Sequence, residues 1–298
     1  MRERDGRCGR TRPNGGTRTE TRGPRPASPP VIDGWGAPCF NAAPVSPSTL
    51  SVVIPAYNEG EHLPRFVENL TRVFLPQPAP AVEFIVSDDG SAPEHSERQR
   101  ASVEAAQARL IAEGSPHRFV YLRAERNGGK GSAIRSGWSH AASEAAWLAF
   151  LDADGAVSAE EFHRLAVLAS GSPEADLIVG SRVKMAGRRV ERTLLRHLQG
   201  RIFATLTEHR FQLGFYDTQC GVKLFRASLL RPLLGLLQEN RWLLDVELLA
   251  LMRRQGAKAL EVPIDWEDPG QSKVIPGLDA AKMFWGLMRL KQRLDRLP

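Results

Sequence analysis

Short apolar runs alternate with helix-like stretches from residue 50 onward, and this alternation limits the possible fold more than any other feature of the sequence. The order is apolar run 51–55, helix 60–74, run 82–86, helix 94–112, run 119–122, helix 130–142, run 147–151, a further helix and run 176–179. Strands that are separated by helices pair in parallel, and the helices cover both faces of the sheet. The sequence therefore predicts an α/β protein with a mostly parallel central sheet flanked by helices.

Beyond residue 185 the alternation is less regular. Helices are expected at 192–213, 242–254 and 278–297, and a strand at 259–264. The last helix has an apolar side and a basic side, formed by Met283, Leu287, Leu290, Leu294 and Leu297 and by Lys282, Arg289, Arg293 and Arg296, respectively. Such a helix either packs on the protein's own sheet or lies in an anionic membrane interface.

Residues 1–49 differ from the rest in composition. They hold eight arginines against four acidic residues, a net of +4 out of the formal +6 of the whole chain. Without a hydrophobic period this segment cannot bury enough apolar surface to offset its ordering entropy, so we expect a disordered basic tail. It is either a solvated extension, the product of a start codon placed too early, or a contact for anionic lipid or nucleic acid. It lacks the apolar core of a signal peptide.

Cysteine content and hydrophobic run lengths exclude several classes of protein. Three cysteines at scattered positions are too few for a disulfide framework or a zinc site, so a reducing compartment is expected. The sequence contains no run of eighteen apolar residues, so we expect no membrane-spanning helix. A lipid substrate would therefore have to be reached from the membrane surface.

Polar clusters follow four of the expected strands at the point where each strand ends. They lie at 57–59, 88–89, 152–154 and 181–182. Ligands of open parallel sheets bind at the carboxyl ends of the strands. Loops can be polar for solubility alone, but the convergence of four charged clusters on one edge favours a binding site there.

The sharpest local feature is the pair Asp152 and Asp154. Carboxylates two residues apart on an extended segment point to the same side and can share one divalent cation. Such a cation can bridge the phosphates of a nucleotide and neutralise a departing diphosphate. The motif alone is common, and its place at the end of an apolar strand is what favours a metal site.

Two further segments have both a structural and a functional interpretation. Asp89, followed by Gly90 and Ser91, either makes a turn or accepts a hydrogen bond from a nucleobase. Asn127 to Gly131 opens a helix, so it is either a loop-to-helix turn or a phosphate contact through Lys130. The latter segment has neither the Walker spacing nor G-x-G-x-x-G, which disfavours those cofactor motifs.

Together these segments resemble a known family. The chain resembles family-2 glycosyltransferases of the GT-A fold in the content, order and spacing of five segments, at 51–59, 87–91, 127–131, 152–155 and 180–182. The downstream segments look like the dolichyl-phosphate β-glucosyltransferase branch, at 217–225, 241–249 and 270–273. The resemblance covers roughly 50–285 and implies a transferase domain there, preceded by the tail 1–49 and followed by the end of an amphipathic helix at 286–298.

The resemblance also implies roles for single residues. Those expected to bind the nucleotide sugar are Pro55, Tyr57, Glu59, Asp89, Asp152, Ala153, Asp154 and Arg182. Asp152 and Asp154 would hold Mg²⁺ or Mn²⁺, and with Arg182 and Lys273, which would hold phosphate oxygens, they form the expected catalytic set. Those expected on the acceptor side are Asp217, Glu247, Ser272 and Lys273. Alternatively, Glu247 pairs with a nearby arginine.

The implied activity is inverting transfer of a hexose, glucose from UDP-glucose, to a polyprenyl or dolichyl phosphate. The protein would then be cytoplasmic and peripheral to the inner face of a membrane, without a nucleic-acid partner. Mannosyl relatives often carry a glutamine metal ligand at the position of Ala156 and an arginine at that of Glu267, which weakens a mannosyl assignment. The alternatives are a mannosyltransferase, a transferase with a soluble acceptor, and a non-catalytic nucleotide-sugar-binding relative.

Overall fold

The structure, a computed structural model, describes residues 50–190, 194–267 and 278–297. Within its helices, the side chains at 194–200, 202 and 278–284 are not described. The expected basic tail at 1–49 lies outside the described residues.

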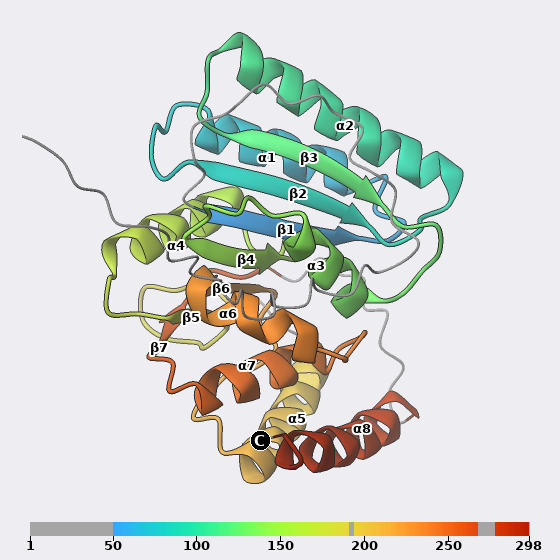
Figure 1. The fold of residues 1–298 in the computed structure, drawn as a ribbon, viewed down its shortest axis with the longest axis vertical. Helices are drawn as coiled ribbons and strands as arrows, with labels where there is room; N and C mark the ends of the chain where they lie inside the picture. The colour runs from blue at the N-terminus through green and yellow to red at the C-terminus, as the bar shows by residue number, and fades with distance from the viewer. Residues whose placement is uncertain (1–49, 191–193, 268–277, 298) are drawn as a thin grey trace, which may run out of the picture. The chain divides into compact units, whose positions relative to one another are not determined.

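One sheet organises the described part of the chain. Its seven strands lie in the order β3-β2-β1-β4-β6-β5-β7 (Figure 1). Their bounds are β1 Leu50–Ala56, β2 Val82–Asp88, β3 Arg118–Arg123, β4 Trp147–Leu151, β5 Leu177–Ser181, β6 Val222–Arg226 and β7 Ala259–Pro263. The pairs are parallel except those of β6, which runs antiparallel to β4 and to β5. The predicted α/β class with a mostly parallel sheet is confirmed.

Helices cover both faces of this sheet (Figure 1). Their bounds are α1 Leu63–Phe74, α2 Pro93–Ala112, α3 Lys130–Ser139, α4 Ala159–Gly171, α5 Leu194–Phe211, α6 Ala227–Leu230, the 3-10 helix η1 Arg231–Leu236, α7 Leu244–Arg254 and α8 Leu278–Asp295. One hydrophobic cluster joins the sheet to α1, α2 and α4, and a second joins it to α3, α6, α7 and α8. The expected elements occur with ends shifted by a few residues.

Strand β1 shows why the apolar runs are continuous. Val52 and Ile54 enter the cluster beneath α1 and α4, while Val53 enters the cluster beneath α3. All three are fully buried, because successive side chains of a strand point to opposite faces and both faces are covered. Both faces of the sheet are therefore covered, and its strand ends are the places where polar side chains can meet a ligand.

Strand β6 was not among the expected strands. Its second residue, Lys223, is fully buried and binds the Asp245 carboxylate of α7 (2.5 Å) and the Cys220 carbonyl oxygen (2.9 Å). A lysine breaks the apolar pattern of the segment, and its burial is tolerable because the distant Asp245 neutralises the charge and the Cys220 carbonyl accepts a further hydrogen bond. Periodicity within the segment alone could not reveal that.

Helix α8 packs on the protein's own core. Leu287, Leu290 and Leu294 are buried in the cluster that also contains α7 residues, so this stripe is not available for a membrane interface. The packing is on helices rather than on the sheet, and the expected boundary at 285/286 falls inside α8. Trp285, by contrast, is 67% exposed. Among the described residues, none of the helices is long and apolar enough to cross a membrane.

Candidate active site

The carboxyl ends of four strands meet at one edge of the sheet. β1, β2 and β4 are parallel, and β5 runs in the same direction because β6 is antiparallel to both β4 and β5. The polar clusters at 57–59, 88–89, 152–154 and 181–182 therefore follow strands that end at the same edge. The loops are joined there by backbone bonds, from the Asp89 amide to the Ala56 carbonyl (2.8 Å) among others.

Asp89 fastens the glycine turn before α3. Its side chain is buried, and its two oxygens accept hydrogen bonds from the amides of Gly128 (2.8 Å) and Gly129 (2.7 Å). Burial raises the pKa of this carboxyl, and the two amide donors oppose that rise. Each carboxylate oxygen has a second lone pair, so the structural role and the expected contact with a nucleobase are compatible.

The loop after β1 presents Tyr57 at the surface. This residue is 42% exposed, and Pro55 and Glu59 beside it are half-buried. Asn58 adopts a left-handed backbone (φ 56°), its amide donates to Ser91 Oγ (2.9 Å), and its side-chain oxygen accepts from the Ala92 amide (2.9 Å). These bonds hold the loop against the one that carries Asp89 and leave the tyrosine ring accessible.

Asp152 and Asp154 lie in a turn directly after β4, not on the extended segment that we expected. Asp152 Oδ1 pairs with Lys130 Nζ (2.6 Å), and the Asp154 side chain accepts from the Ala156 amide (3.0 Å). Ala153 between them is buried. Although Asp154 is exposed at the rim, its pKa is raised to about 6, first by lost hydration and then by the negative charge of Asp152.

The two aspartates fit a divalent metal. Carboxylate oxygens are the ligands that Mg²⁺ and Mn²⁺ prefer, and the mutual repulsion that raises the Asp154 pKa is what a cation would relieve. Among the described residues there is no group of three or more side chains able to hold a metal. Asp152 and Asp154 would hold such a metal together with phosphate oxygens and water, the further ligands that Mg²⁺ usually takes.

Arg182 and Asp217, expected on the donor and acceptor sides respectively, form one ion pair. Arg182 Nε and Nη2 donate to the two Asp217 oxygens (2.6 and 2.9 Å), and Nη2 also donates to the Gln219 carbonyl (3.1 Å). Burial acts to lower the pKa of the guanidinium, but the Asp217 charge outweighs it and raises the pKa. Asp152 acts in the same direction, which places Arg182 within electrostatic reach of Asp152.

A cavity of about 240 Å³ adjoins this pair. It lies between the segment after β5, helix α5 and the loop before β6, and it is lined by Arg182, Val183, Lys184, Val190, Arg201, Phe203, Ala204, Tyr216, Asp217, Thr218 and Gln219. The Arg201 guanidinium lies 4.5 Å from the Tyr216 ring centroid. The Thr218 hydroxyl is buried and has no hydrogen-bond partner among the described residues. The cavity thus combines cationic, apolar and unsatisfied polar groups.

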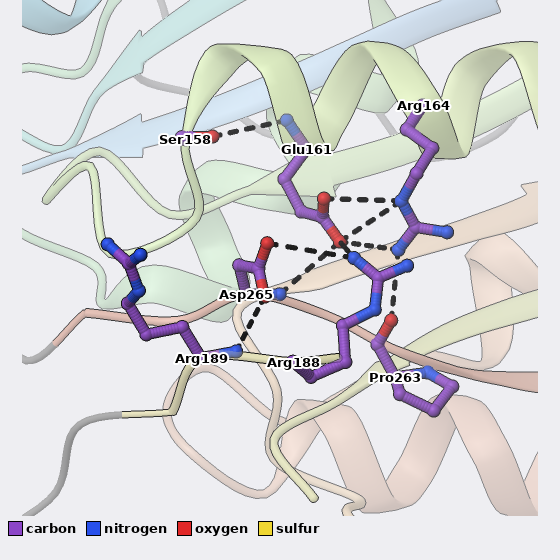
Figure 2. Close-up of polar contacts among 7 residues, drawn as sticks. All are labelled: Ser158, Glu161, Arg164, Arg188, Arg189, Pro263 and Asp265. Atoms are coloured by element: carbon purple, nitrogen blue, oxygen red, sulfur yellow. Dashed lines mark hydrogen bonds and ion pairs between the residues drawn. The ribbon is translucent and has the colours of Figure 1, made fainter. Parts of the chain in front are cut away.

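A polar cluster that the sequence did not reveal is centred on Glu161 (Figure 2). Glu161 of α4, itself buried, pairs with Arg164 and Arg188 and accepts from the Asp265 amide (3.3 Å). The Asp265 side chain accepts from the Arg189 amide (2.7 Å). The cluster therefore joins α4 to the segments that follow β5 and β7. Its partners are up to 104 residues apart, which hides the cluster from local patterns.

The remaining acceptor-side expectations have different outcomes. Glu247 is fully buried and pairs with Arg293 of α8, which is the alternative stated for it. Ser272 and Lys273 lie outside the described residues. Of the four residues expected on the acceptor side, the structure therefore describes Asp217, which lines the cavity, and Glu247, which does not.

Comparison with known proteins gives the family. Residues 51–234 match the profile described as glycosyl transferase family 2. The chain belongs to this family. It is therefore a glycosyltransferase, and the matched region contains the whole rim from Tyr57 to Asp217.

Curated relatives of this family-2 transferase align over most of its length. A dolichyl-phosphate beta-glucosyltransferase of Drosophila melanogaster is 33% identical over 264 residues, covering 84% of this chain and 74% of the relative. One of Dictyostelium discoideum is 28% identical over 262 residues, covering 85% of this chain and 77% of the relative. These relatives are the branch that the downstream segments resemble.

A solved structure shows the same fold. Glucosyl-3-phosphoglycerate synthase from Mycobacterium tuberculosis, in complex with Mn²⁺, UDP-glucose and phosphoglyceric acid, matches with a TM-score of 0.55. The identity is 19%, and the match covers 84% of this chain and 81% of the synthase. The likeness shows the GT-A fold that the sequence resemblance implied.

Proposed function

We propose that this transferase moves glucose from UDP-glucose to a polyprenyl or dolichyl phosphate, with inversion at the anomeric carbon. The observation that carries the proposal is the cavity beside Arg182, which sets cationic and apolar side chains together within electrostatic reach of Asp152. A phosphate joined to an isoprenoid chain has both of those chemical characters. The curated relatives, named for glucosyl transfer to dolichyl phosphate, support the same substrates.

The donor lies along the rim formed by β1, β2 and β4. Tyr57 offers an accessible ring for stacking on the base or ribose, and Asp89 offers carboxylate lone pairs for a nucleobase N–H. Asp152 and Asp154 would hold Mg²⁺ or Mn²⁺, and the GT-A neighbour binds its UDP-glucose together with Mn²⁺. The bound metal supplies positive charge to the departing diphosphate.

The acceptor phosphate enters the cavity. Arg182, Lys184 and Arg201 supply positive charge there, and the Thr218 hydroxyl supplies an unused hydrogen-bonding group. The first isoprene units pack against the apolar lining formed by Val183, Val190, Phe203 and Ala204. Asp217 holds the Arg182 side chain in place through two hydrogen bonds, so the guanidinium is oriented before the phosphate arrives.

The reaction is a single displacement. An acceptor phosphate oxygen forms a bond to the anomeric carbon while the bond from that carbon to the UDP oxygen breaks, and UDP leaves with the electron pair. A phosphomonoester, with a second pKa of about 6, is mostly ionised at neutral pH and needs no strong general base. The site has to supply alignment and cationic charge, which Arg182 and Lys184 provide from this chain. The product is a β-linked lipid-phosphate glucose.

The acceptor would be met at a membrane surface. We infer a cytoplasmic protein in peripheral contact with the membrane, and the exposed Trp285 of α8 supports this, because tryptophan favours the interface of a bilayer. The buried leucine stripe of the same helix takes no part in that contact.

The test is transfer of labelled glucose from UDP-glucose to a short polyprenyl phosphate with Mg²⁺ or Mn²⁺. We expect a glucolipid whose anomeric proton has the coupling constant of a β-linkage. Efficient transfer to phosphoglycerate but not to the lipid phosphate would show a soluble acceptor. Binding of UDP-glucose without turnover on either acceptor would favour the non-catalytic alternative.

A further inference from the structure

The loop 238–241, between η1 and α7, lies against the glycine turn at the start of α3. The Gly131 amide donates to the Asn240 carbonyl (2.8 Å), and Arg135 Nη1 donates to the Glu239 carbonyl (2.6 Å). The Arg135 guanidinium also binds the side-chain oxygen of Asn240. A Cβ atom on Gly131 would collide with the Glu239 carbonyl oxygen, so the two backbones are in direct contact.

The same glycine turn and the lysine after it bind two residues on the nucleotide-sugar side of the site, Asp89 and Asp152. The amides of Gly128 and Gly129 donate to Asp89, and Lys130 pairs with Asp152 (2.6 Å). A shift of the turn would therefore move both the amides that bind Asp89 and the Lys130 ammonium group that pairs with Asp152. The position of loop 238–241 therefore affects the positions of Asp89 and Lys130, which lie on the nucleotide-sugar side of the site.

Glu247 fixes that loop from the protein interior. Its Oε1 accepts from the Gln238 amide and its Oε2 from the Glu239 amide, both at 2.9 Å. The Arg293 guanidinium of α8 pairs with the same carboxylate, which is fully buried. Removing the negative charge of Glu247 would leave the Arg293 guanidinium without its ion-pair partner and one of the two loop amides without an acceptor. The loop would then be held less firmly.

We propose that Glu247 is a positioning residue for the nucleotide-sugar side of the site, acting through loop 238–241 and the glycine turn on Asp89 and Lys130. Arg241, in the same loop, adds a positive charge near Asp89 and strengthens the link. The family resemblance implied an acceptor-side role for Glu247, whereas its contacts lead to the donor rim. The proposal rests on the proposed function in taking UDP-glucose as the donor.

The test compares Glu247→Gln with wild type in two measurements. We expect the KM for UDP-glucose to rise about 10- to 100-fold, as for other groups that orient a binding residue, with the KM for the lipid phosphate unchanged. Hydrogen exchange should become faster at the amides of Gly128, Gly129 and Gly131. A purely structural role would not separate the two KM values.

Two other variants keep the test valid if Glu247→Gln does not fold. Arg135→Met loosens the loop while the Glu247 carboxylate stays in place and should give the same pattern, whereas Arg296→Met, exposed just after α8, should change neither measurement. Unchanged exchange in the glycine turn, or equal changes in both KM values, would overturn the proposal. Hydrogen exchange needs no turnover, so it tests the link from Glu247 to the glycine turn even if UDP-glucose proves to be the wrong donor.

Discussion

At the scale of single residues, the rim is a set of charges that already have partners. Lys130 pairs with Asp152, Lys223 pairs with Asp245, and the two ammonium groups each lie 5.1 Å from the Phe150 ring centroid. Burial acts to lower the pKa of Lys130, but Asp152 outweighs it and raises the pKa. A metal held by Asp152 would be a second cation at this carboxylate, which already pairs with Lys130.

Asp154→Asn tests the metal site. The variant should lose about 3 kcal/mol of transition-state stabilisation, roughly 100-fold in kcat, because the metal loses a charged ligand. Mn²⁺ should raise the melting temperature of wild type but not of the variant. Near-normal turnover that also withstands a chelator would show that the metal is held elsewhere.

The same variant predicts a dependence on pH in the metal-free protein. The folded-state pKa of about 6 lies above the ordinary value of 3.8, so ionisation of Asp154 lowers stability as pH rises through that window. Asn has no charge to form. Thermal melts should therefore coincide below about pH 4 and show a more stable variant above about pH 6.

At the scale of elements, α8 belongs to the core. Leu290 is fully buried and lies in one cluster with residues of α7, and the helix also packs beside α5 (Figure 1). Its Arg293 adds the ion pair to Glu247. The amphipathic pattern of α8 therefore reports burial against neighbouring helices, and its removal would expose the cluster beneath it.

Leu290→Ala should lower the free energy of unfolding by about 2–5 kcal/mol, through lost burial and the cavity left behind. Gln292→Ala, exposed on the same helix, should change it by about 0.5 kcal/mol or less. Urea unfolding measures both. A Leu290 variant as stable as wild type would mean that α8 is dispensable, and deletion of 286–298 would then test membrane attachment without unfolding the protein.

At the scale of the whole molecule, binding of the donor nucleotide sugar should raise the stability of the folded protein. A ligand that binds only the folded state stabilises it by about 2.7 kcal/mol at a hundred times its Kd. With Mg²⁺, UDP-glucose should raise the melting temperature more than GDP-mannose does at equal concentration. Differential scanning fluorimetry measures this shift, and a larger effect of GDP-mannose would favour the mannosyl alternative.

The sequence by itself determined the α/β class, the edge of the sheet that carries the site, the Asp152–Asp154 pair and the family. These features are local, because strand and helix periodicity and the residues at strand ends are each contained within about a dozen residues. The parallel sheet then brings the strand ends together without further information. That is why clusters at 57–59 and 181–182 could be assigned to one edge before any coordinates.

Only the tertiary structure decided the partners of the buried charges and the direction of β6. Arg182 meets Asp217 across 35 residues, and Glu247 meets Arg293 across 46. Whether a charge binds a substrate or another side chain depends on which groups packing brings within hydrogen-bond distance, and no local pattern encodes that. For the same reason the sequence allowed two places for the leucines of α8, and the packing of three helices selected the core.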